Sequence, residues 1–188
     1  CPRLAQKLGL PGNVVVCAGA GDNAAAAVGT GTVGAGDATS PWAPRTLFIS
    51  SDHFGVDPHN ALHAFAHADG CYHLMGCMLS AASCNKWWMD DILGSQDYAG
   101  AQKDITDDKL GCNHVYFLPY LMGERSPIKR YHARSVFIGM TMDTSRTDLT
   151  QAVLEGVAFA IRDSFEVAGP WAGYTPQHDL RRRRKSPL

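Results

Sequence analysis

Residues 19–28 read Gly-Ala-Gly-Asp-Asn-Ala-Ala-Ala-Ala-Val, a glycine-rich turn that leads through one carboxylate into a segment of high helix propensity. The apolar run at 14–18 predicts a short buried strand just before this turn. A strand, a glycine turn and a helix in this order can hold the carboxylate of Asp22 at the mouth of a cleft. Asp22 is therefore a candidate catalytic residue. The competing interpretation is that it only caps the helix, because Asp is among the best N-cap residues.

Sequence periodicity predicts both strands and helices in the rest of the chain. Helical spacing of apolar residues is clearest at 148–168, and a second helix is expected at 79–93 with Gly94 as its stop. Two apolar segments can pair as a hairpin around Asp69-Gly70, a favourable turn sequence. The remaining expected elements are the tail of a helix at 4–10, hairpin strands within 61–68 and 71–77, and strands at 46–50 and 115–121.

Charge and composition exclude several classes of partner. The chain has 188 residues, 45% of them hydrophobic, which is enough for a core, and its 17 basic and 18 acidic residues give a net charge of −1. This balance provides no global field to attract nucleic acid or an anionic membrane. No apolar run reaches the roughly 18–20 residues that span a bilayer, and no signal peptide is visible. The six scattered cysteines form no CxxC pair, so we expect buried thiols and a cytoplasmic protein.

Other reaction chemistries are poorly supported by the motifs present. His63 and His67 stand four apart and His73 follows, but the segment is expected to be a strand, which separates them along one face, so no metal site is predicted. No GxSxG, Walker A or strand-linked GxGxxG motif is present. Glu124-Arg125 fits equally a functional clamp or a local ion pair that fixes a loop.

Four sequence blocks, in order and spacing, carry a family resemblance. They are Gly-Asp-Asn-Ala-Ala at 21–25, Met-Leu-Ser-Ala-Ala-Ser-Cys at 78–84, Phe-Leu-Pro-Tyr-Leu-Met-Gly-Glu-Arg-Ser-Pro at 117–127 and Leu-Glu-Gly-Val-Ala-Phe-Ala at 154–160. A longer pattern from Ser135 to Glu155 agrees with them. Together they resemble the FGGY carbohydrate kinases, and most closely the members that act on D-xylulose. The resemblance covers roughly residues 1–168.

The resemblance implies a fold and a division into domains. FGGY kinases have an α/β fold similar to actin-like ATPases and ribonuclease H, in which two domains close over a cleft. Sugar binds to the first domain and ATP mostly to the second. By this resemblance, residues 1–33 are the end of the N-terminal, sugar-binding domain, and residues 34–188 are the first part of the C-terminal, ATP-binding domain.

The resemblance also implies a reaction, the transfer of the γ-phosphate of ATP to a ketopentose, with D-xylulose as the favoured acceptor. Asp22 would be the general base that accepts the proton of the attacking sugar hydroxyl. Asn23 would hydrogen-bond the sugar hydroxyls. Thr46, Lys185 and Ser186 are the expected ATP contacts, and Mg²⁺ would sit on the phosphates, held largely through water. The partners are then a sugar and ATP, and a homodimer is compatible with the family.

Two windows depart from the family pattern. Residues 40–45 read Ser-Pro-Trp-Ala-Pro-Arg where the family has the phosphate loop Ser-Leu-Gly-Thr-Ser-Gly, and prolines cannot donate backbone N–H groups to phosphate. A glycine-rich turn is likewise replaced within 169–184, which contains a second Pro-Trp-Ala and four arginines. We interpret the windows at 39–45 and 169–184 as shifted reading frames. The alternative is a diverged loop and a basic tail, and a chain with this sequence should bind ATP poorly.

Three hypotheses therefore remain open. We expect this chain to be inactive alone, because it lacks the family's N-terminal phosphate loop and much of its sugar site. Its parent would be a D-xylulose kinase or a kinase for another sugar such as gluconate. The rival from a different class is a catalytically dead actin-like binding module, which would keep its affinity for a ligand without releasing ADP.

Overall fold

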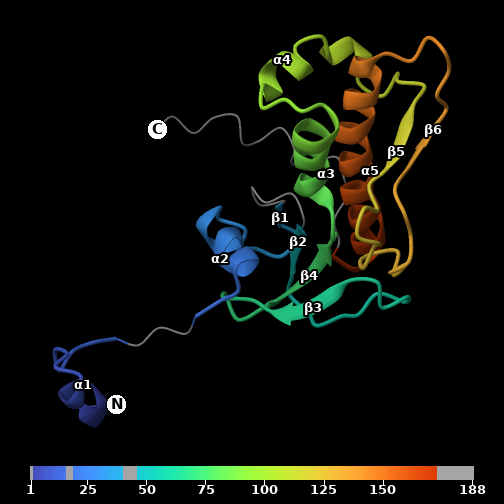
Figure 1. The fold of residues 1–188 in the computed structure, drawn as a ribbon. Coiled ribbons are helices and arrows are strands. Elements are labelled where there is room, and N and C mark those ends of the chain that lie inside the picture. The colour runs from blue at the N-terminus through green and yellow to red at the C-terminus, as the bar shows by residue number, and fades with distance from the viewer. Residues whose placement is uncertain (1, 16–18, 40–45, 173–188) are drawn as a thin grey trace.

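The computed structural model describes residues 2–15, 19–39 and 46–172, which form a mixed α/β structure (Figure 1). The strands are β1 (Ala38–Thr39), β2 (Thr46–Ser51), β3 (His63–Ala66), β4 (Tyr72–Cys77), β5 (Tyr116–Leu118) and β6 (Val136–Ile138). The helices are α1 (Pro2–Lys7), α2 (Asp22–Gly29), α3 (Ala81–Trp87), a π-helical turn η1 (Trp88–Ile92), α4 (Tyr98–Gln102), a 3₁₀ turn η2 (Asp107–Lys109) and α5 (Arg146–Ala172).

The larger sheet is antiparallel and has the strand order β1-β2-β4-β3. Its central strand β2 is buried along its whole length, and Thr46 pairs with Cys77 of β4. The β3–β4 hairpin turns at Asp69-Gly70, as the sequence predicts. Gly70 adopts a φ of 86°, and the Cys71 N–H donates to the Asp69 carboxylate across 2.9 Å. A residue with a side chain would be strained at this φ, so glycine determines where the hairpin turns.

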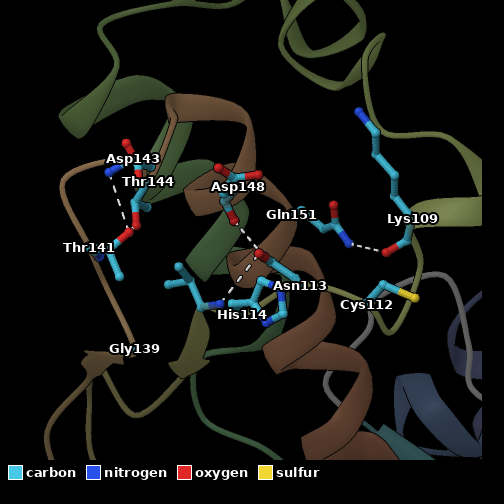
Figure 2. A pocket seen from close by; sticks show the side chains of 11 residues that line it. Lys109, Cys112, Asn113, His114, Gly139, Thr141, Asp143, Thr144, Asp148 and Gln151 are labelled. Carbon is cyan, nitrogen blue, oxygen red and sulfur yellow. Dashed lines mark hydrogen bonds between the residues drawn. The ribbon is translucent and has the colours of Figure 1, made fainter.

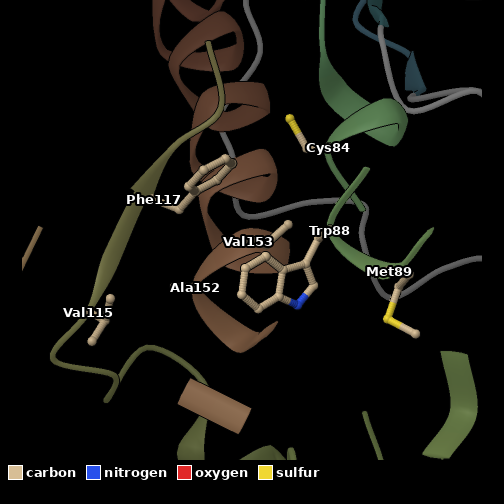
Figure 3. Close-up of a cluster of buried hydrophobic side chains, with 7 residues drawn as sticks. All are labelled: Cys84, Trp88, Met89, Val115, Phe117, Ala152 and Val153. Carbon is tan, nitrogen blue, oxygen red and sulfur yellow. The ribbon is translucent and has the colours of Figure 1, made fainter. Parts of the chain in front are cut away.

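Helix α5 is the element that connects the two sheets. It contacts β2 and β4 of the larger sheet and β5 of the β5–β6 hairpin, and α3 packs against it as well (Figure 1). One buried apolar cluster fills the space between α3, η1, β5 and α5 (Figure 3). Its members are Cys84, Trp88, Met89, Val115, Phe117, Ala152 and Val153. Trp87 and Trp88 therefore belong to or pack against the core, and the Trp88 indole N–H donates to the Thr150 hydroxyl across 3.0 Å.

Two glycines allow α5 to approach both sheets closely. A Cβ on Gly156 would lie 2.2 Å from the carbonyl oxygen of Phe117, which is backbone of β5. A Cβ on Gly76 of β4 would lie 2.6 Å from the hydroxyl oxygen of Ser164. Both contacts are shorter than a real Cβ can make. The short distances between α5 and the sheets at these points are therefore possible only because glycine has no side chain.

A buried carboxylate holds the loop that follows β5. Glu124 is 1% exposed, and its Oε1 accepts hydrogen bonds from the backbone N–H groups of Leu79 (3.2 Å) and Arg125 (2.7 Å). Burial raises the pKa of this carboxyl group, and the two backbone donors oppose that rise. The Ser126 hydroxyl donates to the Ala61 carbonyl across 2.7 Å. These bonds fix the loop to the segments that flank β3 and α3.

An aromatic cluster occupies the larger sheet beside α2. The imidazole of His73 stacks on Phe48 with ring centroids 3.9 Å apart, and His67 and Phe65 lie around it. His73 is 4% exposed. Burial lowers the pKa of His73 from 6.5 to about 4, with His67 acting in the same direction and Asp69 opposing it. His73 is therefore neutral near pH 7.

Most predicted elements are observed, with one correction. The strand predicted at 46–50 and the helices predicted at 79–93 and 148–168 are present, although the first of these helices changes to a π-helical turn before Gly94. The strand predicted at 14–18 is wrong for Val14 and Val15, which lie in no strand, and Val15 is 80% exposed. A strand needs a neighbour to pair its N–H and C=O groups, and no described strand lies beside these two residues. Residues 16–18 of that prediction lie outside the described residues.

No helix within residues 2–15, 19–39 and 46–172 is both long and apolar enough to cross a membrane.

Replacing Gly156 by alanine tests the close approach of α5 and β5. We expect Gly156→Ala to lower the free energy of unfolding by about 1–3 kcal/mol, because the new methyl group forces α5 away from the Phe117 carbonyl. Gly29→Ala is the matched control, since its Cβ meets nothing within 4 Å at the end of a helix. Urea unfolding followed by tryptophan fluorescence measures both. Equal stabilities for the two variants would contradict the packing described.

Replacing His73 by phenylalanine tests the buried aromatic cluster. In the folded state the pKa of His73 is lowered to about 4, whereas in the unfolded chain the imidazole takes up its proton near its ordinary pKa of 6.5. Stability present above about pH 6.5 is therefore lost as the pH falls toward 4, by about 2–3 kcal/mol for this group. We expect His73→Phe to remove that part of the acid sensitivity in urea unfolding at pH 7.5 and 4.5. The same loss in both proteins would show that His73 does not contribute.

Candidate functional site

Asp22 is the first residue of α2 and is exposed to solvent. The N-cap position is held by Gly21, with φ −63° and ψ 152°, and its carbonyl accepts the Ala25 N–H across 2.9 Å. The interpretation of Asp22 as a simple N-cap is therefore wrong, because the glycine already occupies that place. Asp22 Oδ1 accepts one hydrogen bond, from the Asn23 N–H at 2.8 Å. A carboxylate at a helix start is also favoured by the helix dipole.

Asn23 follows Asp22 on the same helical turn and is half-buried. The opposite side of α2 packs inward, and Ala27 is fully buried. The alanine-rich sequence supplies this packing with little loss of side-chain entropy and gives a helix that contacts β2. The structure thus brings the two predicted sugar-site residues together at the exposed start of a helix that packs against the larger sheet.

Of the three predicted ATP contacts, the structure describes Thr46 alone. Thr46 begins β2, is 1% exposed, and its hydroxyl is buried with no hydrogen-bond partner among the described residues. Lys185 and Ser186 lie outside the described residues. Of the two departing windows, Thr39 belongs to β1 and residues 169–172 continue α5, whereas 40–45 and 173–184 are outside the described part of the chain.

Glu124 and Arg125 are brought to the junction of β4 and α3. Their side chains do not form an ion pair with each other among the described residues. Glu124 binds backbone N–H groups, and Arg125 Nη2 donates to the sulfur of Cys77 across 2.8 Å. The contacts favour the loop-fixing hypothesis over the functional clamp, although backbone hydrogen bonds replace the predicted ion pair.

The three histidines singled out in the sequence lie on or beside the β3–β4 hairpin. The His67 and His73 rings meet edge to face with centroids 5.5 Å apart, and His63 pairs with Met75 at the far end of β3. Within the described residues, no three side chains of His, Cys, Asp or Glu are grouped so that they could hold a metal ion.

A cavity of about 300 Å³ opens at the start of α5 (Figure 2), and Asp22 is not among the residues that line it. It is lined by Lys109, Cys112, Asn113, His114, Val115, Gly139, Thr141, Asp143, Thr144, Asp148 and Gln151. The Asn113 side-chain amide donates to the Asp148 carbonyl and the Gln151 amide to the Lys109 carbonyl, each across 2.7 Å. These side chains join loops to the helix, so the cavity is a space between packed loops and we assign it no reaction.

Neither the cavity nor the bond between His67 and Thr32 is indicated by a sequence motif. In the latter, the His67 Nε2 lies 2.9 Å from the Thr32 carbonyl oxygen, although the residues are 35 positions apart. No sequence motif predicts a contact between residues so far apart in the chain. The available signal was only that a histidine follows an apolar strand segment directly before the Asp69-Gly70 turn.

Comparison with known proteins places these features in a family. Residues 45–170 match the C-terminal domain of the FGGY family of carbohydrate kinases. The chain is 42% identical over 169 residues to the xylulose kinase of Klebsiella pneumoniae, which covers 88% of this chain and 34% of that protein. It is 39% identical over 178 residues to the xylulose kinase of Escherichia coli K12, covering 94% of this chain and 36% of the relative.

Solved structures agree with the sequence comparison. A xyloylose kinase from Brucella ovis superposes with a TM-score of 0.76 at 39% identity, covering 92% of this chain and 35% of that one. The chain thus spans about a third of the length of the relatives it matches. Its fold is the α/β, actin-like ATPase fold of these kinases. By its sequence match over 45–170 and by its structure, the chain belongs to the FGGY family of carbohydrate kinases.

Proposed function

We propose that the protein is an ATP-dependent sugar kinase that transfers the γ-phosphate of ATP to D-xylulose, giving xylulose 5-phosphate and ADP. The observation that carries this proposal is the 42% identity to a xylulose kinase over nine-tenths of the chain, together with an exposed Asp22 at the start of α2. The chain spans about a third of that relative, so the activity proposed is that of the whole protein.

Asp22 is proposed as the general base. Its carboxylate is exposed and takes one backbone hydrogen bond at Oδ1, so it is accessible to a sugar hydroxyl. Accepting the hydroxyl proton as the oxygen attacks the γ-phosphate contributes about 10²–10⁴ in rate in enzymes generally. Asn23, on the same turn, is proposed to bind neighbouring sugar hydroxyls, because its side chain offers both a donor and an acceptor without charge.

The proposed domain boundary lies between residues 33 and 34. Support comes from the turn that begins there, in which the Gly34 N–H donates to Asp37 Oδ2 at 3.1 Å and Gly36 adopts a φ of 84°. On this division, α2 belongs to the sugar-binding domain, and the β1-β2-β4-β3 sheet belongs to the ATP-binding domain. We refer to the latter as the ATP-side sheet.

ATP is proposed to bind across the ATP-side sheet with Thr46, Lys185 and Ser186 among its contacts. The Thr46 hydroxyl at the start of β2 is buried and has no hydrogen-bond partner among the described residues. Because buried polar groups are normally hydrogen-bonded, this hydroxyl supports a contact with a ligand. Mg²⁺ would arrive on the phosphates and neutralise charge during transfer. The nucleotide sequence of the gene across both departing windows decides whether the phosphate loop is Ser-Leu-Gly-Thr-Ser-Gly or the encoded Ser-Pro-Trp-Ala-Pro-Arg.

The second candidate function is a binding module of the same fold without catalysis. It is favoured by the proline-containing window at 40–45, which lacks successive backbone donors for phosphate. A kinase for gluconate or another sugar is a variant of the first proposal. Sugar-dependent ADP release separates the enzyme from the binding module, and the ratio of kcat/KM values among D-xylulose, D-ribulose and gluconate identifies the sugar.

Replacing Asp22 by asparagine tests the proposed base. We expect Asp22→Asn to lower kcat for D-xylulose by about 10²–10⁴, because asparagine keeps the size and hydrogen-bonding geometry but cannot accept the proton. The KM values for sugar and ATP should change little. The measurement is coupled ADP release by the protein in its natural full length.

Asp107→Asn is the matched control, because Asp107 is another exposed aspartate at the start of a helical turn. It should leave kcat unaltered. An Asp22→Asn variant with the kcat of the unmodified enzyme would refute the assignment of Asp22. An unmodified protein that binds D-xylulose without releasing ADP would instead favour the binding module.

A further inference from the structure

Within the part of the chain that the structure describes, one hydrogen bond connects the segment after α2 to the β3–β4 hairpin. His67 Nε2 lies 2.9 Å from the carbonyl oxygen of Thr32. A carbonyl oxygen can only accept, so Nε2 carries the hydrogen and donates it. His67 is 7% exposed and Thr32 is fully buried, so water does not compete freely for this bond. Losing the donor would leave a buried carbonyl oxygen without its partner, which is costly in a protein interior.

The His67 side is rigid. Its backbone N–H donates to the Cys71 carbonyl across 2.8 Å, and its own carbonyl accepts the Gly70 N–H across 3.2 Å, so the residue is fixed within the hairpin turn. The ring packs against the side of the stacked Phe48–His73 pair, with its centroid 5.1 Å from that of Phe48 and 5.5 Å from that of His73. The other ring nitrogen, Nδ1, is buried and has no partner among the described residues. The imidazole is therefore oriented by packing and by its one bond to Thr32.

The Thr32 side is coupled directly to α2. The Thr32 N–H donates to the Ala27 carbonyl across 2.9 Å, and its hydroxyl lies 3.4 Å from the hydroxyl of Thr30. Thr30 in turn bonds back to the Ala26 and Ala27 carbonyls. These bonds link Thr32 to the last turn of α2, so a displacement of the Thr32 carbonyl would also displace that turn of the helix that begins at Asp22.

The covalent connection from α2 to the ATP-side sheet runs through a short turn. Asp37 accepts the Gly34 N–H, and the Gly36 N–H donates to the Ser50 carbonyl of β2 across 3.0 Å. This turn contains glycines at 34 and 36, which permit rotation of the backbone. A second, non-covalent attachment beyond the turn would restrict that rotation, and His67 with Thr32 provides one.

We propose that His67 is a positioning residue, which holds α2, and with it Asp22, in a fixed place beside the ATP-side sheet by donating a hydrogen bond to the Thr32 carbonyl. The inference rests on the proposed function, because it matters for phosphoryl transfer only if Asp22 is the base and ATP lies on the sheet. His67 touches neither substrate in this scheme. It aligns two half-sites that each bind their own substrate.

Three variants test this inference. His67→Leu removes the donor and fills part of the space, His67→Gln keeps an N–H donor at about the same reach, and His63→Leu makes the same replacement at the opposite end of β3. Hydrogen exchange of the full chain is measured by mass spectrometry. We expect His67→Leu to speed exchange within residues 22–32 by about tenfold while α5 stays unchanged, because only the local attachment is lost.

The two controls separate positioning from general destabilisation. His67→Gln and His63→Leu should both retain the exchange of the unmodified chain within residues 22–32. The inference is overturned if His67→Leu leaves that segment unchanged, if α5 accelerates to the same extent, or if His67→Gln behaves like His67→Leu.

Kinetics of the full-length enzyme provide the functional readout. We expect His67→Leu to lower kcat by about 10- to 100-fold with little change in KM for D-xylulose or ATP, because alignment affects transfer and not the separate binding steps. His67→Gln should recover most of the kcat. An unchanged kcat in His67→Leu would overturn the positioning of Asp22. A full-length protein without kinase activity would refute the proposed function instead, and exchange alone would then decide whether His67 holds α2.

Discussion

The close packing of α5 against two sheets is the contact on which the described structure depends. The helix lies within backbone contact distance of β5 at Gly156, and Gly76 lets β4 approach it near Ser164. Helix α5 therefore packs on both sheets, and the apolar cluster around Trp88 and Val153 fills the space between α3, η1, β5 and α5. A side chain added at either glycine must move α5. Because packed interiors transmit strain, a shift of α5 at one sheet would also disturb its packing on the other sheet.

The ATP-side sheet that α5 supports also determines where the proposed catalytic group lies. The buried strand β2 contacts α2, and the β3–β4 hairpin bonds to the segment after α2 through His67. Asp22 stands at the far, exposed end of that helix. The location of Asp22 relative to the sheet thus depends on two contacts, the packing of α2 on β2 and the hydrogen bond from His67 to the Thr32 carbonyl. This arrangement gives a physical reason why His67 would affect the proposed phosphoryl transfer without touching either proposed substrate.

Sequence patterns correctly predicted those elements whose formation depends mainly on neighbouring residues in the chain. The helical spacing of apolar residues located α5, and Asp69-Gly70 located the hairpin, because a positive φ is available to glycine at little cost. The glycine-rich turn before Asp22 correctly predicted a helix start there. The motif resemblance indicated the family, which composition and periodicity alone could not have done.

Features that depend on distant residues were not predictable in the same way. Val14 and Val15 look like a strand, but a strand forms only where a neighbour completes its hydrogen bonds. The bond from His67 to Thr32 and the bond from the Leu79 N–H to Glu124 arise from packing between segments 35 and 45 residues apart, respectively. The π-helical turn at Trp88–Ile92 likewise has no signature in the apolar spacing, which continues through it as in an α-helix.

A crystal structure of the full-length protein with D-xylulose and an unreactive ATP analogue measures the distance that the proposed mechanism requires. We predict that a carboxylate oxygen of Asp22 lies within about 2.6–3.2 Å of the sugar hydroxyl that faces the γ-phosphate. The sugar bound elsewhere, such as in the cavity beside Asn113 and Asp148, or a hydroxyl beyond the reach of Asp22, would contradict the assignment of Asp22 as the base.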